Sequence, residues 1–373
     1  MSTLYENLFN ITPQMIVMWL IGGLLIFLAI KKDMEPALLL PMGFGAILVN
    51  LPLSGAVDQI YNGIREIGIV DLLFEKGIAN ELFPLILFIG IGAMIDFGPL
   101  LVNPKLMLFG AAAQFGIFFT LSLASLFGFE LKDAASIAII GAADGPTSIF
   151  VANFLGTKYI GAIIVAAYSY MALVPIVQPP VIRLITTKKE RLIKMPYKNT
   201  QVSKLTKILF PIIVTIITGI CAPRAVVLVG FLMFGNLIRE CGVLNSLSDT
   251  AQNVLANLVT LLLGITVASK MKADDFLNYE TLLILALGLV AFIFDTVGGV
   301  FFAKFLNLFS KNKINPMIGA AGISAFPMSA RVIHKMGLKE DSNNFLLMHS
   351  VGANVSGQIA SVIAGGLILN FVA

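Results

Sequence analysis

The sequence predicts an all-α membrane protein that crosses the bilayer many times, and its composition carries that prediction. Of its 373 residues, 58% are hydrophobic and only 12% are charged, and the mean hydropathy is +0.93. A soluble domain carries about 25% charged residues, so this chain is expected to face lipid. An internal repeat and two interrupted apolar segments indicate how the crossings are organised.

Ten segments are apolar and long enough to predict full crossings, since a membrane helix needs about 20 mostly apolar residues. They lie near residues 14–30, 36–52, 82–101, 106–127, 159–182, 207–222, 224–239, 252–269, 280–309 and 343–371. The segments 134–155 and 314–330 are also apolar, but glycine and proline interrupt them. We expect each of these two segments to form a re-entrant, broken hairpin.

The two halves of the sequence resemble each other, which indicates a duplication. Segments beginning at Glu35 and Leu82 resemble segments beginning at Ala222 and Leu258, and "IGAADGPTSIF" from Ile140 matches "IGAAGISAFPMS" from Ile318. We assign residues 1–184 to the first copy, 185–206 to a basic cytoplasmic loop and 207–373 to the second copy. With five transmembrane helices and one hairpin in each copy, the second copy is predicted to be inverted.

Basic residues predict the orientation. Eight of the 25 Lys and Arg residues fall between Arg183 and Lys207, beside one acid, Glu190. Cytoplasmic loops are rich in Lys and Arg, so we place this loop inside and both chain ends outside. The first hairpin then enters from outside and the second from inside, and the two should meet near the middle of the bilayer. This pattern marks a membrane protein and does not indicate nucleic-acid binding.

The stretch "GAADGPTSIF" places an acid, Asp144, inside an apolar segment. A carboxylate at the bilayer centre costs about 2.5–3.5 kcal/mol, so its presence needs a reason. Pro146 interrupts the helix and frees backbone carbonyls, while Thr147 and Ser148 add hydroxyls. Such a set of oxygens suits a hard, monovalent cation. The alternative is that Asp144 is structural and caps the half-helix that follows.

The second hairpin contains no acid. It supplies Asn315, Ser324 and Ser329, and Arg331 follows its break. Arg331 is expected either to bind an anion or to reach the membrane surface as a snorkelling side chain.

Three further polar residues lie in apolar segments. Tyr170 and Asn354 fall at the depth that the repeat predicts for the centre, although polar side chains also join membrane helices. Asp295 is expected either to bind a proton or an ion, or to pair with a hydroxyl. The sequence contains no His/Cys metal cluster, nucleotide loop or nucleophile–base pair.

Four stretches carry a resemblance to a known family. They are "GAADGPTSIFVANFLG", "VAAYSYMALVPIVQPPVIR", "NPMIGAAGISAFPMSARV" and "GANVSGQIAS". They resemble the β subunits of sodium-pumping biotin-dependent decarboxylases, which act on oxaloacetate, methylmalonyl-CoA or glutaconyl-CoA. The resemblance implies that a carboxyltransferase α subunit moves CO2 onto biotin, that a biotin carrier subunit presents carboxybiotin, and that this chain decarboxylates it and exports Na+. It also implies a small membrane-anchor subunit, a bacterial cytoplasmic membrane and a fold similar to elevator-like carriers, and it leaves open a homo-oligomer.

The resemblance also implies the site residues. Asp144, Tyr170 and Arg331 would be catalytic. Sodium would be bound by Asp144, Asn315, Ser324 and Asn354, and carboxybiotin by Arg331, Asn315 and Tyr170, with Gly319 as a further residue of the motif. The rival hypothesis is a Na+-coupled secondary transporter of an organic anion, which explains the repeat and Asp144 equally well.

Overall fold

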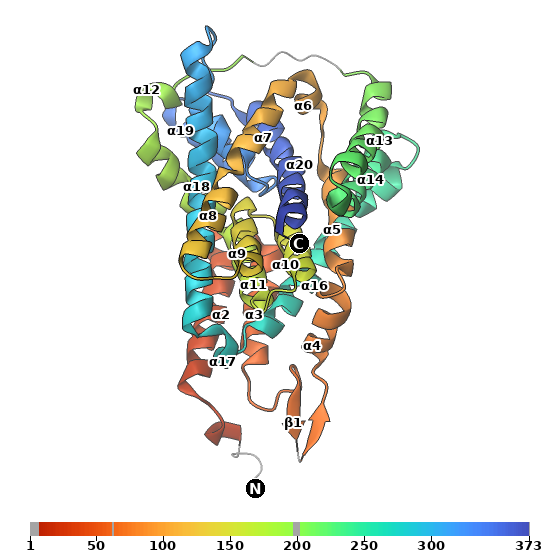
Figure 1. The fold of residues 1–373 in the computed structure, drawn as a ribbon, viewed down its shortest axis with the longest axis vertical. Helices are drawn as coiled ribbons and strands as arrows, with labels where there is room; N and C mark the ends of the chain where they lie inside the picture. The colour runs from red at the N-terminus through yellow and green to blue at the C-terminus, as the bar shows by residue number, and fades with distance from the viewer. Residues whose placement is uncertain (1–6, 62, 197–201, 373) are drawn as a thin grey trace.

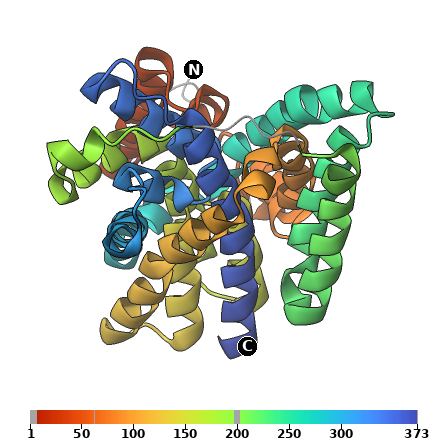
Figure 2. The same ribbon diagram turned by 90° about the horizontal axis from the view of Figure 1, so that it is seen from above.

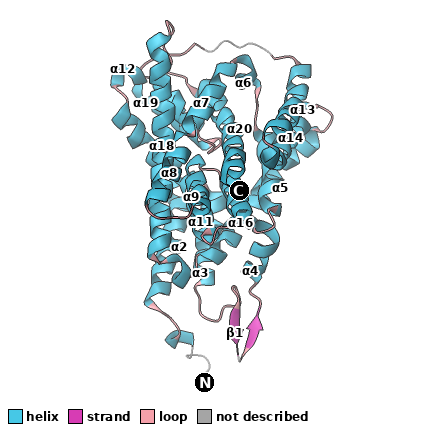
Figure 3. Ribbon diagram, in the orientation of Figure 1, coloured by secondary structure: helices cyan, strands magenta, loops and turns pink. Residues whose placement is uncertain are grey.

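The protein is almost entirely helical in the computed structural model, which describes residues 7–61, 63–196 and 202–372 (Figures 1 and 3). Two short strands, β1 (Gln59–Tyr61) and β2 (Ile64–Glu66), pair antiparallel and lie at the bottom of Figure 1. The short helix α12 and the start of α13, which both fall within the basic loop 185–206, lie at the opposite end (Figure 1). The prediction of an all-α protein is therefore confirmed apart from this small hairpin.

The first half contains the following helices in chain order. They are α2 (Pro13–Lys32), α3 (Pro36–Val49), α4 (Ile69–Leu73), η1 (Phe74–Ile78), α5 (Leu82–Met94), α6 (Gly98–Val102), η2 (Pro104–Leu106), α7 (Met107–Ala113), α8 (Phe115–Leu126), α9 (Leu131–Ala138), η3 (Ile139–Ala142), α10 (Gly145–Leu155), α11 (Ile160–Ile185) and α12 (Lys188–Arg191).

The second half repeats much of this order. Its helices are α13 (Lys204–Cys221), η4 (Pro223–Ala225), α14 (Val226–Glu240), α15 (Asn245–Asp249), η5 (Thr250–Leu255), α16 (Ala256–Val267), η6 (Ala268–Lys270), α17 (Ala273–Phe276), α18 (Tyr279–Phe309), η7 (Pro316–Gly322), α19 (Met328–Glu340) and α20 (Leu347–Val372). The short π-helix η1 precedes α5, and the short π-helix η5 precedes α16. A broken segment precedes each of the long helices α11 and α20. The inversion of the second copy stays a prediction.

Seven helical segments of the described chain are long and apolar enough to cross a membrane, or eight if the pair Ile69–Ile78 and Leu82–Met94, bent by 61°, is one span. The prediction of ten full crossings is therefore not confirmed. Helix α3 has only 14 residues and α14 only 15. Helix α3 ends early because Asn50 leaves the helix and its side-chain amide binds the carbonyls of Ala46 and Met271, at 2.8 and 2.7 Å. Pro52, which has no N–H to donate, follows closely.

The outermost helices present apolar side chains to their surroundings, as lipid contact requires. Only 17% of the apolar window of α2 and 11% of that of α13 is buried inside the protein. Leu20, Leu24, Ile216 and Ile220 are among the exposed apolar residues of these two helices. An exposed apolar surface of this extent is expected in a membrane and not in water.

The long helices form two groups. The first group consists of α2, α3, α5, α13, α14 and α16, in which α5 packs on α14 and α3 packs on α16. Glycines allow the close contact between α5 and α14. A Cβ atom on Gly92 would lie 1.9 Å from the carbonyl oxygen of Leu232, and one on Gly235 would lie 2.0 Å from that of Ile89. Helices α13 and α14 lie together at one side of the molecule in both views (Figures 1 and 2).

The second group consists of α7 to α11, α18, α19 and α20 with the turns η3 and η7. In it α11 packs on α18, and α20 packs on α7. Both broken segments belong to this group. The first is α9–η3–α10, interrupted at Ala143 and Asp144, and the second is η7–α19, interrupted between Gly322 and Met328. The two breaks meet, since the backbone N–H of Ser324 donates to the carbonyl of Ala142 at 3.1 Å. This meeting was predicted from the sequence, whereas its depth in the bilayer stays a prediction.

Candidate functional site

Asp144 lies at the first break, where the chain leaves one half-helix and begins another. Ala143 adopts a left-handed conformation with φ 51°, and Asp144 is extended. Pro146 stands in the first turn of α10, where its missing N–H costs nothing. Oδ1 of Asp144 accepts a hydrogen bond from the backbone N–H of Thr147 at 3.3 Å. The alternative that Asp144 caps the following half-helix is thus confirmed, but this contact uses only one carboxylate oxygen.

The other carboxylate oxygen of Asp144 receives three hydroxyl groups. Thr147 donates to Oδ2 at 2.7 Å, and Ser324 and Ser361 each donate at 3.0 Å. The hydroxyls of Ser324 and Ser361 also lie 3.0 Å from each other. The three come from both broken segments and from α20, and Asp144 is only 4% exposed. The result is a buried cluster of oxygens around one acid, which we call the Asp144 cluster (Asp144, Thr147, Ser324 and Ser361).

Two side-chain amides of α20 hold the second break in place. Asn354 donates to the carbonyl of Ile323 at 2.7 Å, and the amide of Gln358 donates to the carbonyl of Ser324. Both side chains are buried, and their amide oxygens have no hydrogen-bond partner among the described residues. Asn354 and Ser324 were predicted from the sequence. Ser361 and Gln358 were not assigned to the site, although both follow Asn354 on α20 at roughly helical spacing.

Tyr168, rather than Tyr170, lies beside the Asp144 cluster. Its ring packs so closely on Gly145 that a Cβ atom there would lie 2.4 Å away. Tyr168 is 1% exposed, and its hydroxyl has no partner among the described residues. Tyr170 points elsewhere, because its hydroxyl donates to the carbonyl of Leu285 on α18. Residues two positions apart on a helix lie about 200° apart around its axis, so only one of the two tyrosines can face the acid.

The remaining predicted residues lie outside the Asp144 cluster. Asn315 binds the carbonyls of Arg191 and Ile193, both at 2.9 Å, and so fixes the second broken segment to the start of the basic loop. Gly319 serves packing, since a Cβ atom there would lie 1.9 Å from the carbonyl oxygen of Gly299. Arg331 is exposed on α19. Its backbone N–H donates to the carbonyl of Pro327 at 3.2 Å, so the residue lies one helical turn from the break.

Two other predicted residues make structural contacts. The hydroxyl of Ser329 donates to Gln178 at 2.9 Å. Asp295 is fully buried in α18, and its Oδ1 accepts from the backbone N–H of Ile117 at 3.2 Å. The hydroxyl partner that was one alternative for Asp295 is not found in the described structure, and its Oδ2 has no partner there. Asp295 therefore binds the start of α8, at the interruption after α7.

A cavity of about 160 Å³ opens onto the Asp144 cluster and lies between the two groups of helices. Nearly half of its lining comes from the first group: Glu35, Ala37, Leu87, Ile91, Met94, Ala256, Asn257 and Thr260. The rest comes from the second group: Ala143, Asp144, Pro146, Tyr168, Met171, Ser324, Phe326, Pro327 and Gln358. Asp144, Tyr168 and Ser324 are its buried floor, while Ala37 and Asn257 are exposed at its rim.

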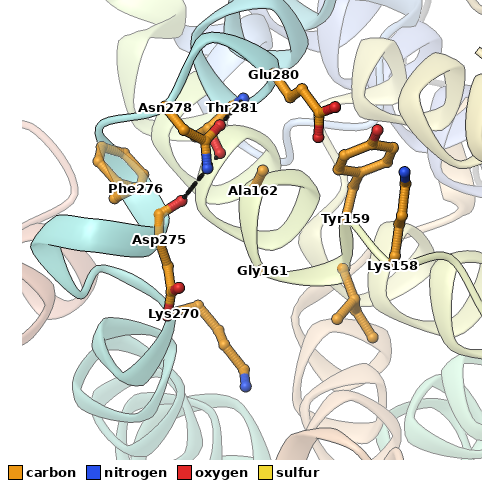
Figure 4. Close-up of a pocket in the computed structure, with 11 residues that line it drawn as sticks. Lys158, Tyr159, Gly161, Ala162, Lys270, Asp275, Phe276, Asn278, Glu280 and Thr281 are labelled. Atoms are coloured by element: carbon orange, nitrogen blue, oxygen red, sulfur yellow. Dashed lines mark hydrogen bonds between the residues drawn. The ribbon is translucent and has the colours of Figure 1, made fainter.

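A second pocket, of about 340 Å³, lies at the starts of α11 and α18 (Figure 4). Lys158, Tyr159, Lys270, Asp275 and Glu280 line it, and none of these was predicted as a site residue. Much of its polar lining is satisfied internally. In particular, the Asn278 side chain accepts from the N–H of Thr281 and donates to the carbonyl of Asp275, both at 2.7 Å.

Groups of three or more His, Cys, Asp or Glu side chains that could hold a metal ion are absent from the described residues. The Asp144 cluster instead offers one carboxylate and several neutral oxygens. A carboxylate with hydroxyl and amide oxygens is a donor set for a hard cation of low charge.

Comparison with known proteins decides the family. A family model described as "Na+-transporting oxaloacetate decarboxylase beta subunit" matches residues 14–372. The chain belongs to this family. It is 46% identical to a probable oxaloacetate decarboxylase beta chain of Vibrio cholerae, with 98% of this chain and 97% of the relative aligned.

Two relatives with other names are about as similar to this chain as the Vibrio cholerae relative is. Identity is 48% to the methylmalonyl-CoA decarboxylase subunit beta of Propionigenium modestum, over 95% of this chain and 94% of the relative. It is 49% to the glutaconyl-CoA decarboxylase subunit beta of Acidaminococcus fermentans, over 95% and 92%. The resemblance noted in the sequence is therefore confirmed. Because relatives of all three names align over nearly their whole lengths, their similarity to this chain does not distinguish the acids that they are named for.

Proposed function

We propose that this chain is the membrane subunit of a bacterial sodium pump, and that it decarboxylates carboxybiotin carried by a partner subunit and couples this reaction to Na+ export. The family membership supports a decarboxylase β subunit. The single observation that carries the ion-binding part is the buried Asp144 cluster, in which three hydroxyls surround one carboxylate oxygen.

Sodium would be bound by Asp144 with the hydroxyl oxygens of Thr147, Ser324 and Ser361. Each hydroxyl now donates to the acid, and rotation about its C–O bond would turn a lone pair toward a cation instead. The amide oxygens of Asn354 and Gln358, which have no partner in the described structure, would be available as further ligands. Asn315, the other residue proposed for sodium, would act through the backbone of the second break.

Carboxybiotin is an anion, so a cation near the rim of the cavity is its natural receiver. Arg331, one turn after Pro327 at that rim, fits this role. Decarboxylation breaks the bond between the ring nitrogen and the carboxylate carbon, releases CO2 and requires one proton at that nitrogen. Tyr168 borders the cavity and is better placed to supply the proton than Tyr170, the residue that the family resemblance implied.

The cavity between the two groups of helices supports transport by alternating access. Movement of the second group against the first would expose Asp144 to one side of the membrane and then to the other, as in carriers with inverted repeats. Tyr168 also belongs to a buried apolar cluster that includes Ile149, Ile164, Val165 and Leu263. Outward Na+ movement against the membrane potential requires about 2.3 kcal/mol per charge per 100 mV, and decarboxylation would supply it.

The proposal includes partners of stated kinds: a carboxyltransferase α subunit, a biotin carrier subunit and a small membrane-anchor subunit, in the cytoplasmic membrane. The deciding experiment measures Na+-dependent decarboxylation of free carboxybiotin by the purified complex, with wild-type chain and with Asp144→Asn. Loss of Na+ stimulation in the variant, with the complex still assembled, is expected. A variant that pumps at the wild-type rate would refute the site, and a protein that never copurifies with a biotinylated subunit would favour a secondary transporter.

A further inference from the structure

Glu35 is a second carboxylate on the cavity that contains Asp144. It stands in the turn between α2 and α3, after two apolar helices have been brought together, and adopts a left-handed conformation with φ 37°. A residue other than glycine rarely adopts this conformation. The turn thus directs a half-buried acid toward the cavity from the first group of helices.

No described residue donates a hydrogen bond to the carboxylate of Glu35 or pairs with it within ion-pair distance. The charged groups around it are Arg331 of α19 and Asp33 of the same turn. Burial raises the pKa of Glu35, which lies outside the membrane-spanning helices, and Arg331 partly opposes that shift. A half-buried acid without a partner is costly unless something else binds it.

The cavity also contains polar groups that lack partners. Tyr168 and Gln358 line it and are at least nine-tenths buried, and neither the hydroxyl of Tyr168 nor the amide oxygen of Gln358 has a hydrogen-bond partner among the described residues. Glu35 at the rim, Tyr168, Gln358 and Asp144 at the floor therefore line one cavity. A cation entering the cavity would meet a carboxylate at its mouth and another at its floor.

We propose that Glu35 is a cation-binding residue at the mouth of the cavity, which receives Na+ first and passes it to Asp144. This inference rests on the proposed function of Asp144 and goes beyond it by naming the path. It also links the two substrates. Arg331 beside Glu35 disfavours a cation at the mouth, so an anion bound to Arg331 would lower that electrostatic barrier. Sodium binding would then be favoured once carboxybiotin is in place.

The test uses the whole complex and compares wild type with Glu35→Gln, Glu35→Asp and a matched control, Asp33→Asn. The control removes the same charge from the same turn at a residue that does not line the cavity. Glu35→Gln is expected to raise the half-saturating Na+ concentration for decarboxylation about five- to tenfold, with the rate at saturating Na+ within about twofold of wild type. Glu35→Asp should recover part of the affinity, and Asp33→Asn should stay within about twofold.

A second measurement makes the result independent of turnover. Binding of radioactive Na+ to the purified complex should weaken in Glu35→Gln and become stronger in wild type when free carboxybiotin is added. An unchanged half-saturating Na+ concentration in Glu35→Gln would overturn the inference. So would a variant in which only the KM for carboxybiotin changes, since Glu35 would then serve only as a counter-ion of Arg331. Failure of the proposed function is a separate outcome, seen as Na+ stimulation that persists in Asp144→Asn.

Discussion

Removal of one hydroxyl from the Asp144 cluster should weaken sodium binding without disturbing the fold. Ser361→Ala deletes the α20 hydroxyl that lies 3.0 Å from Oδ2 of Asp144 and 3.0 Å from the hydroxyl of Ser324. In the proposed site this hydroxyl oxygen would turn toward the bound ion, and a contact between a polar group and a charged one contributes about 1.5–3 kcal/mol. The two other hydroxyls stay in place, so we take the lower end of that range, which corresponds to about a tenfold change in an equilibrium constant.

The assay is the Na+ dependence of carboxybiotin decarboxylation by the purified complex. Ser361→Ala should raise the half-saturating Na+ concentration about tenfold. The matched control is Ser350→Ala on the same helix, because the buried hydroxyl of Ser350 has no partner in the described structure and its loss should leave the Na+ dependence unchanged. If Ser361→Ala and Ser350→Ala both behave as wild type, the hydroxyls do not belong to a sodium site and the reasoning is wrong.

Three further predictions address the tyrosines, the orientation and the movement. Tyr168→Phe should lower the decarboxylation rate at least about tenfold, as expected for loss of a general acid. Tyr170→Phe loses the contact with Leu285 and should change thermal stability more than the rate. A larger loss of rate in Tyr170→Phe than in Tyr168→Phe would assign the proton to Tyr170. Lys335→Cys, exposed on α19, should react with a membrane-impermeant maleimide only from the cytoplasmic side, and labelling only from outside would refute the orientation. The carbonyl of Ala79 and the side-chain amide of Asn153 lie 3.0 Å apart. A cross-link between cysteines placed at these two positions should stop turnover but not Na+ binding. Undiminished pumping by the cross-linked protein would instead favour a fixed pore with local gates.

The site could be predicted from the sequence only where local chemistry marks it. Asp144 is recognisable because an acid beside Gly-Pro in an apolar segment has few structural explanations. Ser361 is not, because nothing in "GQIASVIAGG" separates a serine that faces an acid from one that packs between helices. Its role depends on the tertiary contact of α20 with both breaks, which a single sequence does not contain.

The crossings show a similar division between what composition reveals and what packing decides. Long segments such as the one that forms α18 were found from hydropathy. Segments 36–52 and 224–239 are also apolar, yet they form only α3 and α14, of 14 and 15 residues, and α3 ends early because a turn after it binds another element. The choice between Tyr168 and Tyr170 likewise needed the helix to be placed against its neighbours, since periodicity shows that the two differ in direction but not which one faces the acid.

The glycine contacts between α5 and α14 have a mechanical consequence. At Gly92 and Gly235 the backbone of each half lies directly against a carbonyl of the other half, so the two helices interlock and any sliding would drive those atoms into each other. Packed helices tolerate only small shear displacements even when side chains separate them. The first group of helices would therefore behave as a stiff frame. Any large stroke of this protein would then occur along the face that carries the cavity, where side chains rather than backbones meet.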